Sequence, residues 1–360
     1  MPATTVIFII LAAFIAVIAV MTLISWLFYK KYFSERYTTP PSLMFYPEDF
    51  DGLNRRRIDF CTDHGRRLAG YLYSVGDAPP RGIVVLAHGF GTGGHSCYMD
   101  CADYFAQNGY LVFTYDATGN DASEGRGING LPQGVIDLDY ALRFVKSSPD
   151  IPKNLPIMLF GHSWGGYCVS AVLNYHDDIR GVVAISGFNR SSDLVEAHAG
   201  KIFGKCVRFA MPFVRIAEML RFGKYAKNTA MRAFSRTKAA VCVVHSEDDK
   251  IVPIRYGYDI YKKKYASDPR FRFIRFTDKG HSSVYNTYEG IRYVDKLFED
   301  MYVWRRTLDY AWNEPENRAR YEADKEAWTL EHFEKSVRLR MLDKELFDGF
   351  VRFFDGLTTN

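Results

Sequence analysis

Ser163 lies in a sequence setting that suits nucleophilic chemistry. Residues 161–165 read Gly-His-Ser-Trp-Gly, which fits the pattern G-x-S-x-G of a serine held on a sharp turn between a strand and a helix. The apolar run 157–160 predicts the strand, and residues 167–173 predict the helix. Glycine two residues before the serine and two after it leaves room for such a turn to close.

A serine hydroxyl is a poor nucleophile at neutral pH, so it needs a neighbouring base and a group that orients this base. Candidates for both follow the ends of the last two predicted strands. Asp248 and Asp249 follow the first of these strands, and His281 follows the second. The order serine, aspartate, histidine predicts that Ser163 attacks a carbonyl carbon and that His281 takes the serine proton. One of the two aspartates would then orient the histidine ring and stabilise its charged form.

A glycine-rich turn follows the predicted strand 82–87 and begins with His88, Gly89 and Phe90. It does not match a phosphate-binding loop, because no G-K-[ST] follows and no G-x-G-x-x-G opens a helix. An oxyanion loop fits better, since there backbone N–H groups must face the reacting carbonyl. We therefore predict an oxyanion hole formed by the backbone N–H groups of Phe90 and Trp164.

These residues need a sheet that gathers them at one edge. Apolar runs that predict buried strands alternate with helical stretches, a rhythm typical of a parallel sheet in an α/β fold. The carboxyl ends of parallel strands meet at one edge of the sheet, where ligands bind. The predicted strands are residues 57–61, 68–75, 82–87, 111–115, 157–160, 181–187, 239–246 and 271–276.

Further details of this core follow from local patterns. Helix 131–145 is predicted with Asp137 and Asp139 on or near its solvated side, and helix 285–298 is predicted to close the core. Asp116, at the end of a strand, could be taken for a catalytic acid. A carboxylate that braces its loop is the favoured interpretation.

With these residues in place, residues 56–298 resemble the α/β-hydrolases, in the branch that holds monoacylglycerol lipases, lysophospholipases, cinnamoyl esterases and serine-aminopeptidase-like proteins. The resemblance implies a mostly parallel eight-stranded sheet flanked by helices, with a helical lid inserted after the sixth strand. It rests on four short matches in the right order: His88-Gly89-Phe90, residues 161–166, Asp249-Lys250-Ile251-Val252-Pro253 and Gly280-His281.

The resemblance also selects among candidate residues. The family pattern D-x-x-V-P favours Asp249 over Asp248, so the implied catalytic residues are Ser163, Asp249 and His281. Residues 119–123 depart from the family's usual G-x-G-x-S, which leaves the shape of that loop open. Structural rather than catalytic roles are expected for His88, His162 and His245.

Residues 188–237 break the alternation of strands and helices and are predicted to form an amphipathic helical lid. This lid segment contains ten basic and three acidic residues, a net charge of +7. Its basic side could rest on anionic lipid headgroups. Alternatively, the charges form a solvated face over a lid whose apolar side lines the substrate pocket. The two interpretations are compatible with each other.

Residues 6–29 predict an N-terminal membrane anchor, because the run is apolar apart from two hydroxyl residues. At ~1.5 Å per residue it would extend for ~36 Å, enough to cross a bilayer core with some tilt. A cleaved signal peptide is disfavoured, since no Lys or Arg precedes this long run. Aromatic residues that suit a membrane interface end the run, namely Trp26, Phe28 and Tyr29. The positive-inside rule then predicts a single-pass protein of the cell membrane with its globular part in the cytoplasm. The basic residues behind this orientation are Lys30, Lys31 and Arg36.

The chain of 360 residues can hold one large α/β domain with additions. The apolar stripe within 342–354 predicts that the end of the chain docks onto the core. The predicted parts are an anchor with its basic flank (1–36), a linker or extended arm (37–54), a hydrolase core (55–187 and 238–300), the lid segment (188–237) and a helical extension (301–360).

Composition narrows the choice of partners. A net charge of +4 is too small to indicate nucleic acid, and six scattered cysteines lack C-x-x-C spacing. We therefore expect no metal, no cofactor and no nucleic-acid partner. The expected partners are an ester or acyl-lipid substrate and a membrane, which is reached through residues 6–29 and the basic lid.

Together these patterns predict a membrane-anchored serine hydrolase of the carboxylesterase or lipase type. It would cleave a carboxylic ester, with mono-acyl lipids as candidate substrates, through an acyl-enzyme intermediate. An acyltransferase, or an amide or peptide hydrolase, stays open, because the sequence does not show how far the lid excludes water. A non-enzymatic binding protein of the same fold is a third hypothesis.

Overall fold

The structure, a computed structural model, describes residues 2–91 and 93–358 and contains an eight-stranded sheet in the order β1-β4-β6-β5-β7-β8-β9-β10. β4 pairs antiparallel with both β1 and β6, and the other neighbours pair parallel. The predicted mostly parallel sheet is therefore confirmed. Its strands are β1 (Leu53–Arg57), β4 (Gly70–Val75), β5 (Ile83–Ala87), β6 (Leu111–Tyr115), β7 (Ile157–His162), β8 (Ile179–Ile185), β9 (Ala240–Ser246) and β10 (Phe271–Phe276), and a separate small ladder joins β2 (Phe60–Cys61) to β3 (Arg67–Leu68).

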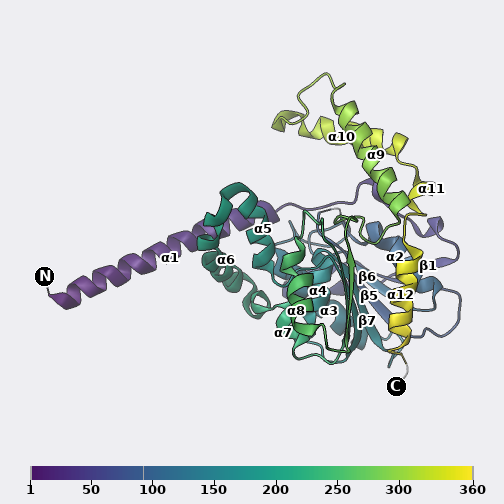
Figure 1. The fold of residues 1–360 in the computed structure, drawn as a ribbon, viewed down its shortest axis with the longest axis horizontal. Helices are drawn as coiled ribbons and strands as arrows, with labels where there is room; N and C mark the ends of the chain where they lie inside the picture. The colour runs from purple at the N-terminus through teal and green to yellow at the C-terminus, as the bar shows by residue number, and fades with distance from the viewer. Residues whose placement is uncertain (1, 92, 359–360) are drawn as a thin grey trace.

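Helices cover both faces of this sheet and extend from two of its sides (Figure 1). They are α1 (Ala3–Phe33), α2 (Met99–Gln107), α3 (Leu131–Ser147), α4 (Trp164–Ala171), α5 (Ser191–Phe203), α6 (Val207–Phe222), α7 (Ala230–Phe234), α8 (Tyr258–Tyr265), α9 (Tyr288–Arg305), α10 (Arg318–His332), α11 (Lys335–Arg338) and α12 (Lys344–Asp355).

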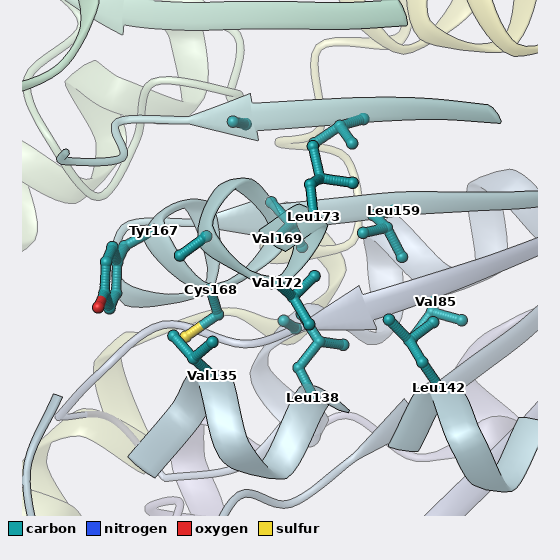
Figure 2. Packing of buried hydrophobic residues seen from close by; sticks show 14 of the residues in the cluster. Val85, Val135, Leu138, Leu142, Leu159, Tyr167, Cys168, Val169, Val172 and Leu173 are labelled. Carbon is teal, nitrogen blue, oxygen red and sulfur yellow. The ribbon is translucent and has the colours of Figure 1, made fainter. Parts of the chain in front are cut away.

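The core is divided into two layers by the alternation of side chains along the buried strands. On one face, Val85, Leu159 and Val182 stand side by side in register and pack against α3 and α4, as Figure 2 shows for Val85 and Leu159. On the other face, their neighbours Leu86 and Phe160 pack against α2 and α12. Both faces of the sheet are covered by helices, so the side chains on both are buried. These strands are therefore apolar at nearly every position.

The helix that closes the second face differs from the predicted one. Helix 285–298 was expected there, but α9 points away from the sheet, and Gly290 and Met301 are its buried residues. α12 takes this place instead, because Phe347 and Phe350 enter the apolar cluster around Phe160. The end of the chain is thus part of the core.

Asp137 and Asp139 were expected on or near the solvated side of their helix, and both are fully buried. Each has enough hydrogen-bond donors to offset the loss of water. Thr118 N–H donates to Asp137, and Tyr225 Oη–H and His176 donate to Asp139. The helix period alone did not reveal these polar contacts inside the core.

α1 leaves the globular part as a long single helix, and α5 and α6 lie beside its last turns (Figure 1). α1 is long and apolar enough to cross a membrane by length and composition. After α1, the chain packs onto the core, with Thr39 and Phe45 both buried. Of the predicted linker or arm 37–54, residues 37–52 therefore form a packed arm, and residues 53–54 begin β1.

Candidate active site

The turn between β7 and α4 places Ser163 at the edge of the sheet in a strained conformation. Its φ of 57° and ψ of −116° lie where residues with a Cβ are rarely found. A Cβ at Gly161 would collide with the Gly165 carbonyl oxygen, and one at Gly165 would collide with the Ala87 carbonyl oxygen. Both glycines of the G-x-S-x-G pattern are thus required by contact between backbones.

Ser163, His281 and Asp249 form one hydrogen-bonded series. The Nε2 atom of His281 accepts from Ser163 Oγ–H at 2.8 Å, and its Nδ1–H donates to Asp249 Oδ2 at 2.7 Å. These side chains come from the ends of β7, β9 and β10, so the parallel sheet brings together residues that are 118 and 32 positions apart. The arrangement has the geometry of a nucleophile, a base and an orienting carboxylate.

Asp249 is held in its ionised form by its surroundings. Its Oδ1 accepts from the backbone N–H groups of Ile251 and Val252 at 2.9 and 2.7 Å. Burial alone would raise the pKa of this carboxyl, but the hydrogen bonds and charges of His245 and His281 lower the pKa below its ordinary value. A negative Asp249 fixes the His281 tautomer that leaves Nε2 free to accept a proton.

His245 contacts Asp249, which the sequence did not reveal. It was expected to be structural, yet its Nε2 lies 3.2 Å from Asp249 Oδ2 as well as 2.9 Å from the Val252 carbonyl oxygen. The carboxylate of Asp249 is therefore shared by two histidines. The position of His245 four residues before Asp249 was the available signal, but helical or strand spacing does not predict contact across a loop.

The neighbouring Asp248 has a different set of partners. Its Oδ1 accepts from Ser246 Oγ–H at 2.6 Å and from Gly280 N–H at 2.9 Å. These bonds join the loop after β9 to the loop that carries His281. Asp248 thus braces the site, and Asp249 contacts the histidine ring.

Two further histidines brace the loops around Ser163. His162 accepts from Tyr98 Oη–H at 2.9 Å and donates through Nε2–H to the His281 carbonyl oxygen at 3.0 Å. Burial and the nearby charge of His281 lower the pKa of His162 to about 3, so it stays neutral. His88 accepts from Ala117 N–H at 2.9 Å, and burial lowers its pKa as well.

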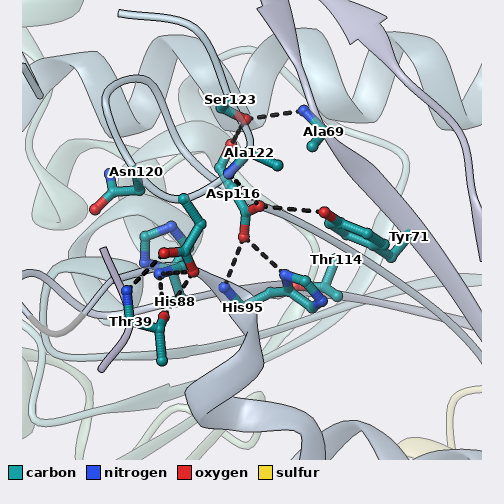
Figure 3. A network of polar contacts seen from close by, with 12 residues as sticks. Thr39, Ala69, Tyr71, His88, His95, Thr114, Asp116, Asn120, Ala122 and Ser123 are labelled. Atoms are coloured by element: carbon teal, nitrogen blue, oxygen red, sulfur yellow. Dashed lines mark hydrogen bonds and ion pairs between the residues drawn. The ribbon is translucent and has the colours of Figure 1, made fainter. Parts of the chain in front are cut away.

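Asp116 lies in a separate polar network that holds the loops beside the site (Figure 3). It accepts from the backbone N–H of His95 at 2.9 Å and from His95 Nδ1–H at 2.7 Å. Burial opposes ionisation, but the charge and hydrogen bonds of His95 hold the pKa of Asp116 below its ordinary value. Ser123, in the loop that departs from the family pattern, donates to the Asp116 carbonyl oxygen and accepts from Ala69 N–H. These contacts make Asp116 a brace for its loop.

Ser163 and His281 face a cavity of about 620 Å³ with mainly apolar walls. Phe90 and Trp164, the predicted oxyanion residues, line it and pack edge to face with ring centroids 6.1 Å apart. The lid segment contributes Leu194 and other residues of α5. Four aromatic residues at the end of α1 also line this cavity, namely Phe28, Tyr29, Tyr32 and Phe33. No pattern in the sequence linked the anchor to the site.

Part of the chain is similar in sequence to known proteins. Residues 78–233 match the sequence model of a family described as serine aminopeptidase, S33. A polyketide transferase of Aspergillus fumigatus is 31% identical over 114 residues, which cover 31% of this chain and 38% of that protein. A monoacylglycerol lipase of Mycolicibacterium smegmatis is 31% identical over 124 residues, which cover 34% of this chain and 42% of that protein. The chain thus spans about two fifths of these curated relatives.

Solved structures extend the likeness in fold to about three quarters of the chain. An esterase of Pyrococcus furiosus has a TM-score of 0.52 at 18% identity, and the match covers 74% of this chain and 96% of the esterase. An acetyl xylan esterase of Paenibacillus sp. R4 also has a TM-score of 0.52, at 19% identity, with 71% and 85% covered. The chain accordingly has the α/β-hydrolase fold, and its residues 78–233 match the family model described as serine aminopeptidase, S33.

Proposed function

We propose that the chain is a membrane-anchored serine hydrolase that cleaves carboxylic esters, with mono-acyl lipids as its substrate class. The observation that carries this proposal is the hydrogen-bonded series from Ser163 Oγ through His281 to Asp249 at the floor of a mainly apolar cavity. The esterase and lipase relatives support the hydrolase part. The apolar helix α1 supports the membrane part.

In this mechanism, Ser163 Oγ attacks the ester carbonyl carbon while His281 Nε2 takes the hydroxyl proton. The backbone N–H groups of Phe90 and Trp164 hold the resulting oxyanion. His281 then gives its proton to the leaving alcohol, and an acyl group stays on Ser163. Water enters, loses a proton to His281 and releases the acid. Asp249 stabilises the positive ring of His281 in both halves.

The cavity favours esters with apolar acyl groups over peptides with a free amino terminus. An aminopeptidase must offer a carboxylate or a comparable acceptor to the ammonium group of its substrate. Among the described residues that line the cavity, none is an aspartate or a glutamate. Apolar walls instead suit an acyl chain, which gains free energy by leaving water.

Acyl transfer is the second candidate, and the polyketide transferase relative is the observation that favours it. Hydrolysis and transfer share the acyl-enzyme and differ in the acceptor that removes the acyl group. Product analysis with an added alcohol distinguishes them, because a transferase would form the new ester in preference to the free acid.

The experiment that tests the proposal is hydrolysis of p-nitrophenyl esters from acetyl to palmitoyl by the wild type and by Ser163→Ala. We expect turnover that rises with acyl length in the wild type and is lost in Ser163→Ala. Equal turnover in the two proteins would contradict the role of Ser163. Turnover restricted to acetyl esters would contradict the lipid substrate.

A further inference from the structure

The cavity at Ser163 has its mouth between the end of α1 and the end of α5. Ser163 is 8% exposed and forms the floor, whereas Tyr32 of α1 is 47% exposed and Ile202 of α5 is 66% exposed. Lining residues that are exposed mark the place where the cavity meets its surroundings. The exposed Ile251 and Ser282, from the loops after β9 and β10, also border the cavity, so the gap between α1 and α5 forms one side of its mouth.

α1 is built into the globular part at this point. Tyr29 is buried, and its Oη accepts from Leu131 N–H at 3.1 Å. A Cβ at Gly130 would collide with the Tyr29 ring, so the chain leaves space for this side chain. The Phe33 carbonyl oxygen accepts from Asn129 N–H at 3.1 Å. The wall that α1 contributes is thus fixed to the elements that carry the site.

The lid helix α6 lies along the half of α1 that is nearer to the site. Ile216 and Leu220 of α6 border a groove whose other side runs from Ile15 to Trp26 of α1. The part of α1 before this groove, residues 3–14, has a length of only ~18 Å. A bilayer core is ~30 Å thick, so α1 crosses it only if the half beside α6 is also inside.

The outward side of α6 has side chains of the kinds that bind a membrane surface. Phe209 is 82% exposed, and Leu220 is exposed as well. These two residues lie about three helical turns apart on the same side of α6, and both expose apolar side chains to the surroundings, which water does not favour. Exposed basic side chains lie on α6 or next to its ends and suit anionic headgroups, namely Lys205, Arg208, Arg215, Arg221 and Lys224.

We propose that α6 and the mouth of the cavity lie in one leaflet of the bilayer, so that a single-chain acyl lipid enters the site sideways between α1 and α5 without crossing water. The partner is an anionic leaflet, and α1 serves both as anchor and as wall of the acyl-binding cavity. The substrate part rests on the proposed function. The embedding of α6 rests on the position of α1 and on the exposed apolar residues.

The embedding of α6 is tested by the depth of a fluorescent label in the membrane, a measurement that does not depend on enzymatic activity. The full chain, with Cys61, Cys97 and Cys206 changed to Ser, carries a bimane label at Phe209→Cys or, as a control, at Phe298→Cys on α9. Phe298 is 63% exposed but lies on a helix far from α1 (Figure 1). In vesicles of phosphatidylcholine and phosphatidylglycerol, doxyl-labelled lipid should quench the label at 209, and aqueous iodide should quench the label at 298. Iodide quenching at 209 as strong as at 298 would overturn the proposal.

Lateral entry is tested by the ratio of two activities, namely turnover of a long-chain mono-acyl ester in these vesicles and turnover of soluble p-nitrophenyl acetate. Phe209→Asp should lower this ratio about tenfold or more, since the helix loses the burial of a Phe side chain. Phe298→Asp should leave the ratio unchanged. An equal ratio in all three proteins would overturn lateral entry. A wild type that turns over neither ester would instead contradict the proposed function, and the quenching result would still decide the embedding.

Discussion

At the scale of single residues, the negative charge of Asp249 next to His281 decides whether His281 can act as the base. Asp249 is buried, contacts two histidines and accepts hydrogen bonds from two backbone N–H groups. Asp248, one position earlier, is occupied with Ser246 and Gly280. Two adjacent carboxylates of the same chemistry thus have separate roles, which substitution can distinguish.

Asp249→Asn should lower kcat for a p-nitrophenyl ester about 10³- to 10⁴-fold, because the amide no longer stabilises the charged ring or its required tautomer. Asp248→Asn should stay within about tenfold of the wild type, because the Asn oxygen still accepts the bonds from Ser246 and Gly280. Steady-state kinetics of both variants provide the measurement. A larger loss in Asp248→Asn than in Asp249→Asn would contradict the assignment.

At the scale of elements, a buried acid joins α1 to the lid. Glu218 of α6 is 2% exposed and hydrogen-bonds with Ser191 of α5 and Tyr29 of α1. Burial raises the pKa of Glu218 to about 7 from its usual 4.5, and the hydrogen bonds offset only part of this effect. The packing of α1, α5 and α6 therefore favours the protonated form of Glu218.

The folded chain binds this proton more tightly than the unfolded chain, so the contribution of Glu218 is fully present below pH 4.5 and is lost as the pH rises to about 7. The free energy of unfolding should fall by up to roughly 3 kcal/mol across this window from this group. Glu218→Gln, which cannot ionise, should flatten the dependence. Tm in detergent across the window provides the test, and an equal slope in both proteins would contradict it.

At the scale of the whole molecule, the end of the chain supports the loop that carries His281. Lys279 is buried, and its Nζ donates to Asp343 Oδ2 at 2.6 Å and to the Asn286 carbonyl oxygen at 2.8 Å. Asp343 also caps α12 by accepting from Leu346 N–H. The helix that closes the sheet and the loop of the candidate base are therefore linked by one ion pair.

Asp343→Asn keeps the cap, since Asn caps as well as Asp, but removes the charge opposite Lys279. We expect a loss of about 1–3 kcal/mol in the free energy of unfolding, because a buried ammonium group loses its charged partner. Glu345→Gln, at an exposed position of the same helix, is the matched control and should have little effect. Equal denaturant midpoints for the two variants would contradict the link.

Patterns along the chain predicted seven of the eight strands of the sheet and the loops that carry Ser163, Asp249 and His281. The prediction of the first strand at 57–61 was wrong, because β1 is Leu53–Arg57 and residues 60–61 pair with β3 in the separate small ladder. Strands are short and apolar here, and a parallel sheet brings their ends together whatever the loops do.

The docking of residues 342–354 onto the core was predicted from their apolar stripe, and α12 confirms it. The role of α9 was not predictable in this way, because it also has apolar side chains at helical spacing, yet only α12 fits the aromatic layer around Phe160.

Contacts between distant segments account for the other differences. Tyr29 was assigned to the membrane interface, and its place against Leu131 depends on packing across about a hundred residues. Asp137 follows the solvated side of its helix by period, yet Thr62 and Thr118 supply donors from other elements. The period of apolar residues describes a single helix or strand. It does not predict these contacts, because they form between different elements.

Covalent capture tests whether Ser163 is the nucleophile, without any choice of substrate. The full chain in detergent is treated with a fluorophosphonate and measured by intact-protein mass spectrometry, followed by peptide mapping. We expect one adduct per wild-type chain, located on Ser163, with no adduct in Ser163→Ala and strongly slowed formation in His281→Ala. An unmodified wild type, or an equal adduct in Ser163→Ala, would contradict this role of Ser163.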